Sequence, residues 1–248
     1  MDKKELKVYG FVFARGGSKG VKNKNIRLVA GRPLIHYSVE AAKRSCFINR
    51  IIVSTDNKDI EKAALEAGAE VPFLRPRDLA SDASPEWLSW QHAVKTLKKA
   101  GEEFDIFVSI PATSPLRTAE DIDMCIKVLI ENNDADGAIT VCRAQRHPSF
   151  NMVVMDDNGF ATIAVPDKFC FSRRQDVPSM YDITTVAYAA RPGFILSAPS
   201  LFAGKIKAVV IPGERSLDID TEFDLKVADL IINDRLKKES KKWEKELL

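Results

Sequence analysis

A glycine-rich basic loop near the start of the chain has the residue types of an anion-binding site. An apolar run at 8–14 leads directly into Arg15-Gly-Gly-Ser-Lys-Gly20. Glycines let backbone N–H groups turn toward one point and allow an anion to approach closely. Lys19 can neutralise phosphate charge, and Arg15 can do so with two parallel hydrogen bonds. The loop therefore predicts a phosphate-binding site where a strand ends.

The loop differs from the two commonest phosphate-binding motifs. It lacks the Gly-Lys-Ser/Thr that closes a P-loop. Gly17 and Gly20 match the later glycines of Gly-x-Gly-x-x-Gly, but Arg15 stands where a dinucleotide site needs its first glycine for a tight turn. These differences disfavour NAD or FAD, while a solvated strand–helix loop without a ligand stays open as an alternative.

An acidic pair near the C-terminus has the residue types of a metal site. The segment 217–220 alternates like a strand, and residues two apart in an extended backbone point to the same face. Asp218 and Asp220 would then form a hard oxygen site, which Mg²⁺ commonly shares with substrate phosphates. The alternative is that one aspartate only caps the last helix, which Thr221-Glu-Phe-Asp224 would start as a capping box. A phosphate loop in the same chain favours the metal.

The elements that position these groups alternate between strands and helices. Short β-branched runs predict strands at 8–14, 50–55, 71–74, 105–110 and 137–142, and helical patterns lie between them at about 32–45, 57–67, 84–100 and 119–132. This rhythm predicts an α/β fold, a doubly wound and mostly parallel sheet with helices on both faces. Ligands of such sheets bind at the carboxyl ends of the strands. The basic loop, Ser54-Thr-Asp56 and Pro111-Ala-Thr-Ser-Pro115 all fall at such ends.

The rhythm breaks between about 143 and 190. Apolar runs at 152–155 and 160–165 flank Asp156-Asp-Asn-Gly159 and predict a hairpin. A polar loop with Ser172-Arg-Arg-Gln-Asp176 follows, and then an alternating strand at 183–190. We interpret this stretch as a small insert in a single domain of residues 1–248, suited to a second substrate or a dimer contact. The main pattern resumes at 206–211 and ends in a helix with one apolar face.

Composition disfavours several classes of function. The chain has 248 residues and a formal net charge of +2, too balanced to favour nucleic acid or a membrane surface as partner. No apolar run approaches the roughly 20 residues of a membrane span, and the N-terminus lacks a signal-peptide core, so we expect a cytoplasmic protein. The cysteines and histidines are isolated, which indicates neither zinc nor redox chemistry.

Several blocks of the chain together resemble one family. Taken in order they are 14–25, 28–35, Val53-Ser-Thr-Asp56, Phe73-Leu-Arg-Pro76, Ala112-Thr-Ser-Pro-Leu-Arg117, Arg173-Arg-Gln-Asp176 and Leu217-Asp-Ile-Asp-Thr221. As a set they resemble the acylneuraminate cytidylyltransferases, the CMP-sialic acid synthetases, over most of the chain. The resemblance implies a nucleotidyltransferase, Rossmann-like fold. It also implies a homodimer in which the inserted segment completes the partner's sugar site.

The resemblance also implies a reaction, in which CTP and a 2-keto acid sugar give a CMP-sugar and pyrophosphate with Mg²⁺ as cofactor. We expect the anomeric hydroxyl of the sugar to attack the α-phosphorus of CTP. Arg15 and Lys19 would stabilise the phosphate charge, and Asp220 would orient or deprotonate the hydroxyl. The site residues that the resemblance implies are, for CTP, Arg15, Ser18, Lys19, Lys24, Asn25 and Arg75; for the sugar, Thr113, Ser114, Arg173 and Gln175; and for the metal, Asp218 and Asp220.

Two departures from the family pattern concern the sugar. Pro111 stands where the family often has glutamine, and proline supplies no side-chain amide. Thr184-Thr185 replaces an Asn-Gly step. N-acetylneuraminic acid is therefore one candidate beside legionaminic and other 5,7-diamino sugars, KDO-like acids and 8-amino variants. Two other functions stay open: an enzyme that uses a ready-made nucleotide sugar, like a glycosyltransferase, and a non-catalytic nucleotide-binding regulator.

Overall fold

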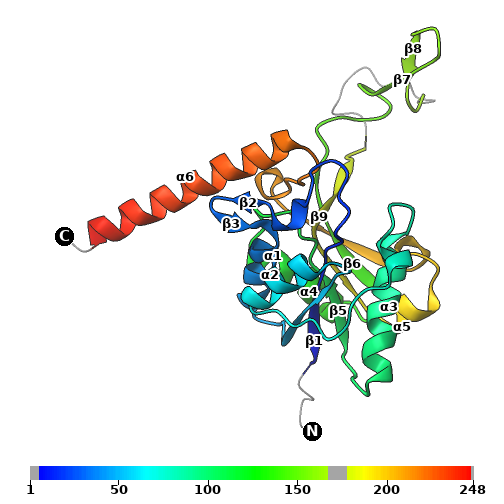
Figure 1. Cartoon of the computed structure of the whole chain (residues 1–248). Helices are drawn as coiled ribbons and strands as arrows, with labels where there is room; N and C mark the ends of the chain where they lie inside the picture. Colours follow the sequence, from blue (N-terminus) through cyan, green and yellow to red (C-terminus); the bar gives the residue numbers. More distant parts are fainter. Residues whose placement is uncertain (1–5, 167–177, 247–248) are drawn as a thin grey trace.

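Figure 1 shows a computed structural model of the chain, which describes residues 6–166 and 178–246. Within these residues, six strands form the main sheet in the order β10-β6-β9-β5-β1-β4. All neighbours pair in parallel except β9, which runs antiparallel to β5 and β6. The predicted mostly parallel sheet is confirmed. Its strands are β1 (Val8–Phe13), β4 (Arg50–Ser54), β5 (Ile106–Ser109), β6 (Gly137–Arg143), β9 (Tyr181–Ala190) and β10 (Ile206–Val210).

Helices cover both faces of the sheet, as predicted (Figure 1). One face packs against α1 (Leu34–Lys43), α2 (Lys58–Glu66) and α4 (Ala119–Glu131), and the other against α3 (Glu86–Lys99) and α5 (Pro192–Ser197). Strand β1 shows why both faces are apolar. Its residues alternate between the two hydrophobic clusters, because successive side chains of a strand point to opposite faces.

A separate hydrophobic cluster joins the C-terminal helix α6 (Glu222–Glu246) to the hairpin of β2 (Leu28–Val29) and β3 (Arg32–Pro33). The fully buried Ile219 belongs to this cluster, which anchors the acidic segment beside the sheet. The capping box predicted for α6 is present, because Thr221 Oγ1 accepts from the Asp224 amide at 3.2 Å while Asp224 Oδ2 accepts from the Thr221 amide at 2.8 Å. From this start α6 extends away from the sheet (Figure 1).

The predicted hairpin is confirmed as β7 (Val153–Met155) and β8 (Ala161–Ile163), which project away from the sheet (Figure 1). The strand that follows is a different case. We placed it in the insert at 143–190, but β9 lies between β6 and β5 in the centre of the main sheet. The part of the insert outside the sheet therefore ends before Tyr181. The single-domain organisation stays a prediction.

Two predicted strands are wrong. The run 71–74 forms no strand: among the described residues its Leu74 makes an isolated bridge to Thr55, and the preceding Glu70 makes another to Ile52. Pro72 explains this, since a proline lacks the N–H that a ladder needs. The acidic segment 217–220 is neither helix nor strand, and its Ile219 amide donates a backbone hydrogen bond to the Thr113 carbonyl at 2.9 Å.

Candidate active site

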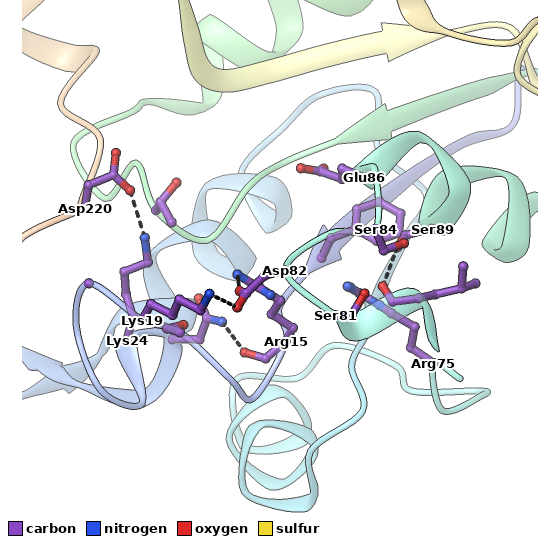
Figure 2. A pocket seen from close by; sticks show the side chains of 16 residues that line it. Arg15, Lys19, Lys24, Arg75, Ser81, Asp82, Ser84, Glu86, Ser89 and Asp220 are labelled. Atoms are coloured by element: carbon purple, nitrogen blue, oxygen red, sulfur yellow. Dashed lines mark hydrogen bonds and ion pairs between the residues drawn. The ribbon is translucent and has the colours of Figure 1, made fainter. Parts of the chain in front are cut away.

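A pocket of about 540 Å³ lies at the carboxyl edge of the sheet, between the basic loop and the start of α3. Figure 2 shows Asp220 and Lys24 toward one end, Arg75 with Ser84 and Ser89 toward the other, and Arg15 between them. The predicted CTP residues all line it, as do Thr113 and Asp220. The lining consists of Phe13, Arg15, Ser18, Lys19, Gly20, Lys24, Asn25, Arg75, Leu79, Ser81, Asp82, Ser84, Glu86, Ser89, Thr113 and Asp220.

The basic loop is held from both sides by polar side chains. The Gly16 amide donates to Asp56 Oδ1 at 2.9 Å, and Asn25 Nδ2 donates to the Arg15 carbonyl at 3.0 Å. Asp56 therefore fixes the loop and occupies an amide that we expected to face phosphate. The amides of 17–20 make no hydrogen bond within the described part of the chain. They stay available as donors to an anion.

The cations of the loop share one carboxylate. Asp82 contacts Arg15 at 2.5 Å and Lys19 at 2.7 Å (Figure 2). Hydrogen bonds from Lys19 and then Arg15 lower the pKa of Asp82 below its usual value. In this arrangement an acidic side chain occupies the place where two cations converge. A phosphate group offers the same bidentate oxygen chemistry and would compete with it.

Arg75 forms the opposite end of the pocket and is buried, with 7% of its surface exposed. Its Nη2 donates to the Ser54 carbonyl at 2.6 Å, and its guanidinium stands 5.4 Å from the centre of the Phe13 ring. Burial lowers its pKa, partly opposed by Glu86 and Asp56. The buried Ser84 hydroxyl has no hydrogen-bond partner among the described residues. This end thus combines an aromatic ring with fixed donors, the features that recognise a planar polar ring.

The acidic segment closes the pocket beside the glycine loop. Lys24 Nζ donates to the Ile219 carbonyl and lies 3.2 Å from Asp220 Oδ1. Gly20 touches the same segment so closely that a Cβ there would stand 2.2 Å from the Asp220 carbonyl oxygen. Lys24 thus anchors this segment as well as lining the pocket. The two predicted motifs, 200 residues apart, are therefore in direct contact.

The two aspartates differ in their surroundings. Asp220 lines the pocket and its side chain is 74% exposed, whereas Asp218 is not a lining residue. Asp218 Oδ1 is buried without a hydrogen-bond partner in the described part of the chain, so this oxygen could take a cation as its partner. No group of three or more acidic, histidine or cysteine side chains gathers around a point among the described residues. Two carboxylates with substrate phosphates nevertheless fit Mg²⁺.

The turn after β5 places the expected sugar residues differently from one another. Thr113 lines the pocket, whereas Ser114 is fully buried and pairs with the Thr185 hydroxyl at 2.6 Å. Pro111 is buried, and Thr184 turns inward to donate to Thr140 Oγ1 at 2.7 Å. Neither departure from the family pattern lines the described pocket. Arg173 and Gln175 lie outside the described residues.

Two acidic residues that the sequence did not predict, Asp82 and Glu86, line the pocket. Asp82 stands in the polar run Ser81-Asp-Ala-Ser84, which signals a loop but not an ion pair with Arg15. Glu86 Oε1 accepts from Trp90 Nε1 at 2.9 Å, one helical turn away. A carboxylate at the first turn of a predicted helix usually indicates capping. Nothing in the sequence at either position distinguishes a residue of the pocket from an ordinary surface residue.

Comparisons with known proteins identify the family of the chain. The cytidylyltransferase family model matches residues 10–201. The post-translational flagellin modification protein B of Campylobacter coli is 33% identical over 225 residues, covering 90% of this chain and 94% of that protein. CMP-N,N'-diacetyllegionaminic acid synthase of Campylobacter jejuni is 32% identical over 223 residues, covering 90% and 93%.

A solved structure extends the agreement to the fold. A CMP-2-keto-3-deoxy-manno-octonic acid synthetase in complex with CTP has a TM-score of 0.68 at 18% identity, covering 92% of this chain and 99% of that one. At this identity the likeness concerns the fold alone. The match of the family model over most of the chain, on a sheet that carries the basic loop at its ligand edge, shows that the chain belongs to the cytidylyltransferase family.

Proposed function

We propose that this protein transfers CMP from CTP to the anomeric hydroxyl of a nonulosonic acid and releases pyrophosphate. One observation carries the proposal: the loop cations Arg15 and Lys19 share one pocket with Arg75 and with Asp220. A cationic cradle suits a triphosphate, the Arg75 end suits its base, and the acidic edge suits a metal and a hydroxyl nucleophile.

The residues of the pocket divide the chemistry between them. The triphosphate would take the place of Asp82 against Arg15 and Lys19, with further donors from the free loop amides. The oxygen of the sugar hydroxyl then bonds to the α-phosphorus, and the bond from that phosphorus to the pyrophosphate oxygen breaks. Asp220 would accept the hydroxyl proton or orient it. The cations stabilise the charge that leaves with pyrophosphate.

The metal belongs to this proposal. Mg²⁺, when bound, would neutralise phosphate charge and polarise the nucleophile. Asp218, with its unpartnered buried oxygen, and Asp220, with its exposed carboxylate, are the residues that would hold it. Lys24, bonded to both the Ile219 carbonyl and Asp220, would keep this acidic edge in place before the metal arrives.

The acceptor sugar and the oligomeric state are proposed from other observations. The named legionaminic acid relative favours a 5,7-diamino nonulosonic acid as acceptor. We assign Thr113, Ser114, Arg173 and Gln175 to the sugar side, with Ser114 acting through the backbone turn that it stabilises. The hairpin of β7 and β8 exposes large apolar side chains, Met155 and Phe160 at 73% each, and this favours a homodimer that covers them. Use of the cellular CTP pool favours a cytoplasmic location, and none of the described helices is long and apolar enough to cross a membrane.

A pyrophosphate-release screen tests the proposal. Purified protein with CTP and Mg²⁺ is offered a panel of nonulosonic and octulosonic acids, with UDP- and GDP-sugars as alternative donors. CTP-dependent release with at least one nonulosonic acid is expected. Asp220→Ala should abolish it, whereas Asp134→Ala, an exposed aspartate before β6, should not. Wild-type turnover in Asp220→Ala would refute the assigned role, and activity with a ready-made nucleotide sugar would favour the glycosyltransferase alternative.

A further inference from the structure

Arg117 is a buried cation next to the pocket, with 5% of its surface exposed. Its guanidinium donates to three parts of the fold. Nη1 donates to Ser38 Oγ of α1 at 2.6 Å, and Nη2 donates to the Thr185 carbonyl of β9 at 2.8 Å and to the Pro111 carbonyl. A buried charge is costly unless it is well bonded. A neutral residue could fill this space without the desolvation cost of a buried charge, which indicates that the arginine has a role besides packing.

The turn that Arg117 holds also carries the acidic segment. Pro111 and Thr113 belong to this turn, and the Thr113 carbonyl accepts from the Ile219 amide at 2.9 Å. Ile219 is fully buried and separates the two aspartates in sequence. The position of both carboxylates therefore depends on where the Thr113 carbonyl lies. That carbonyl belongs to the turn whose Pro111 carbonyl accepts a hydrogen bond from the Arg117 guanidinium.

Electrostatics also links Arg117 to the acidic segment. Burial lowers the pKa of Arg117 to about 9, and Asp218 is the acid that opposes this most. Arg117 Nε and Asp218 Oδ1 are both buried, and neither has a hydrogen-bond partner in residues 6–166 and 178–246. The guanidinium thus faces the acidic segment electrostatically without an ion pair that would occupy the carboxylate. The oxygens of Asp218 remain available.

We propose that Arg117 is a positioning residue, which holds the turn of Pro111 and Thr113 and through the Thr113–Ile219 hydrogen bond sets the place of Asp218 and Asp220. Its consequence for turnover rests on the proposed function. The placement itself does not, because it concerns only the backbone of this chain. The inference is therefore testable in two independent ways.

Hydrogen exchange tests the placement without any substrate. In Arg117→Lys the shorter side chain keeps the charge but cannot reach three acceptors at once. We expect exchange at the Ile219 amide to accelerate about tenfold relative to wild type. Arg191→Lys is the matched control, since Arg191 donates to the carbonyls of Ala135 at 3.0 Å and Leu129 at 3.2 Å on the far edge of the sheet. It should leave Ile219 exchange unchanged.

Steady-state kinetics tests the consequence. In Arg117→Lys the half-saturating Mg²⁺ concentration should rise about tenfold with a lower kcat, because a displacement of the two carboxylates by about 1 Å is enough to impair catalysis. KM for CTP should stay within about twofold, since Arg15 follows β1 and Arg75 follows the bridge from Leu74 to Thr55, and neither belongs to the turn that Arg117 holds. A merely structural loss would lower kcat in Arg117→Lys and Arg191→Lys alike and would not change the Mg²⁺ requirement.

Ser38→Ala keeps the test decisive if Arg117→Lys does not fold. It removes one acceptor of Arg117 on α1 together with the hydrogen bond from Ser38 Oγ to the Pro111 carbonyl at 3.1 Å. The same turn is therefore held less firmly, and Ile219 exchange should accelerate about two- to threefold. Unchanged Ile219 exchange in the folded variants, or equal acceleration in Arg191→Lys, would overturn the inference. A wild-type protein without CTP-dependent turnover would count against the proposed function alone, and the exchange result would still decide the role of Arg117.

Discussion

Replacing Gly20 by alanine should impair catalysis while the protein stays folded. The residue lies where the basic loop touches the acidic segment, and a Cβ there would stand 2.2 Å from the Asp220 carbonyl oxygen. The opposing atom belongs to the backbone, so no flexible side chain can move aside. The added methyl group therefore separates the two halves of the pocket.

The size of the effect follows from the distance. Real Cβ atoms do not approach a neighbour closer than 3.0 Å, so the loop or the Asp220 segment must retreat by at least about 0.8 Å. A misplacement of about 1 Å can cost about 100-fold in rate, or ~2.7 kcal/mol of transition-state stabilisation. We expect kcat/KM to fall by about this factor. The midpoint of thermal unfolding should change little, because the contact lies at the open rim of the pocket.

Two other glycines of the same loop supply controls. A Cβ at Gly17 would meet no atom within 4 Å, and one at Gly16 would meet the Asn57 side chain at 2.9 Å. Gly17→Ala should therefore lose less activity than Gly20→Ala, and Gly16→Ala should lose activity to an intermediate degree, because a side chain can yield. Initial rates of CTP-dependent pyrophosphate release give the ranking. Wild-type activity in Gly20→Ala, or a larger loss in Gly17→Ala, would refute the contact between loop and acidic segment.

Three further predictions concern the ion pair, the thiols and the last helix. Asp82→Asn should tighten binding of pyrophosphate, measured by calorimetry, by about two- to fivefold, because it removes a competitor from exposed cations; weaker binding would contradict this. A maleimide should label Cys46 in the native protein but Cys125 only after unfolding, since burial raises the pKa of Cys125 to about 12; peptide mapping detects either result. Asp224→Asn should lower the free energy of unfolding by ~0.5 kcal/mol at pH 7. The Thr221 hydroxyl lowers the pKa of Asp224 in the folded protein, so the Asp224 carboxylate stabilises the fold at any pH above its pKa in the unfolded chain. This stabilisation is lost as the pH falls through the folded pKa, and the denaturant midpoints of the two proteins should converge below about pH 4.

The sheet could be predicted because its signals are local. Alternating β-branched runs and helical periods mark β1, β4, β5 and β6, and their boundaries agree within a few residues. The position of β9 could not be read in this way. An antiparallel strand that enters the middle of a sheet has the same local pattern as a strand in an insert, and only the pairing of distant segments separates them. Pro72 was a visible reason to reject the strand at 71–74.

The site could be predicted in its parts but not in its contacts. The residue types of Arg15, Lys19 and Asp220 predicted phosphate and metal chemistry, and all three residues line the same pocket. The ion pairs of Asp82 and the burial of Ser114 depend on tertiary packing, which no spacing encodes. The Gly20 contact is of the same kind: many loop glycines serve a turn, and this one makes room for a backbone from the other end of the chain.

The most direct test of the account is identification of the product. CTP, Mg²⁺ and the best acceptor from the screen are incubated with the protein, and the mixture is separated and examined by mass spectrometry and phosphorus NMR. We predict one pyrophosphate for each CMP-sugar, with a phosphodiester at the anomeric carbon and no product when the acceptor is omitted. Pyrophosphate release without an acceptor, or no CTP-dependent product with any keto-acid sugar, would contradict the account.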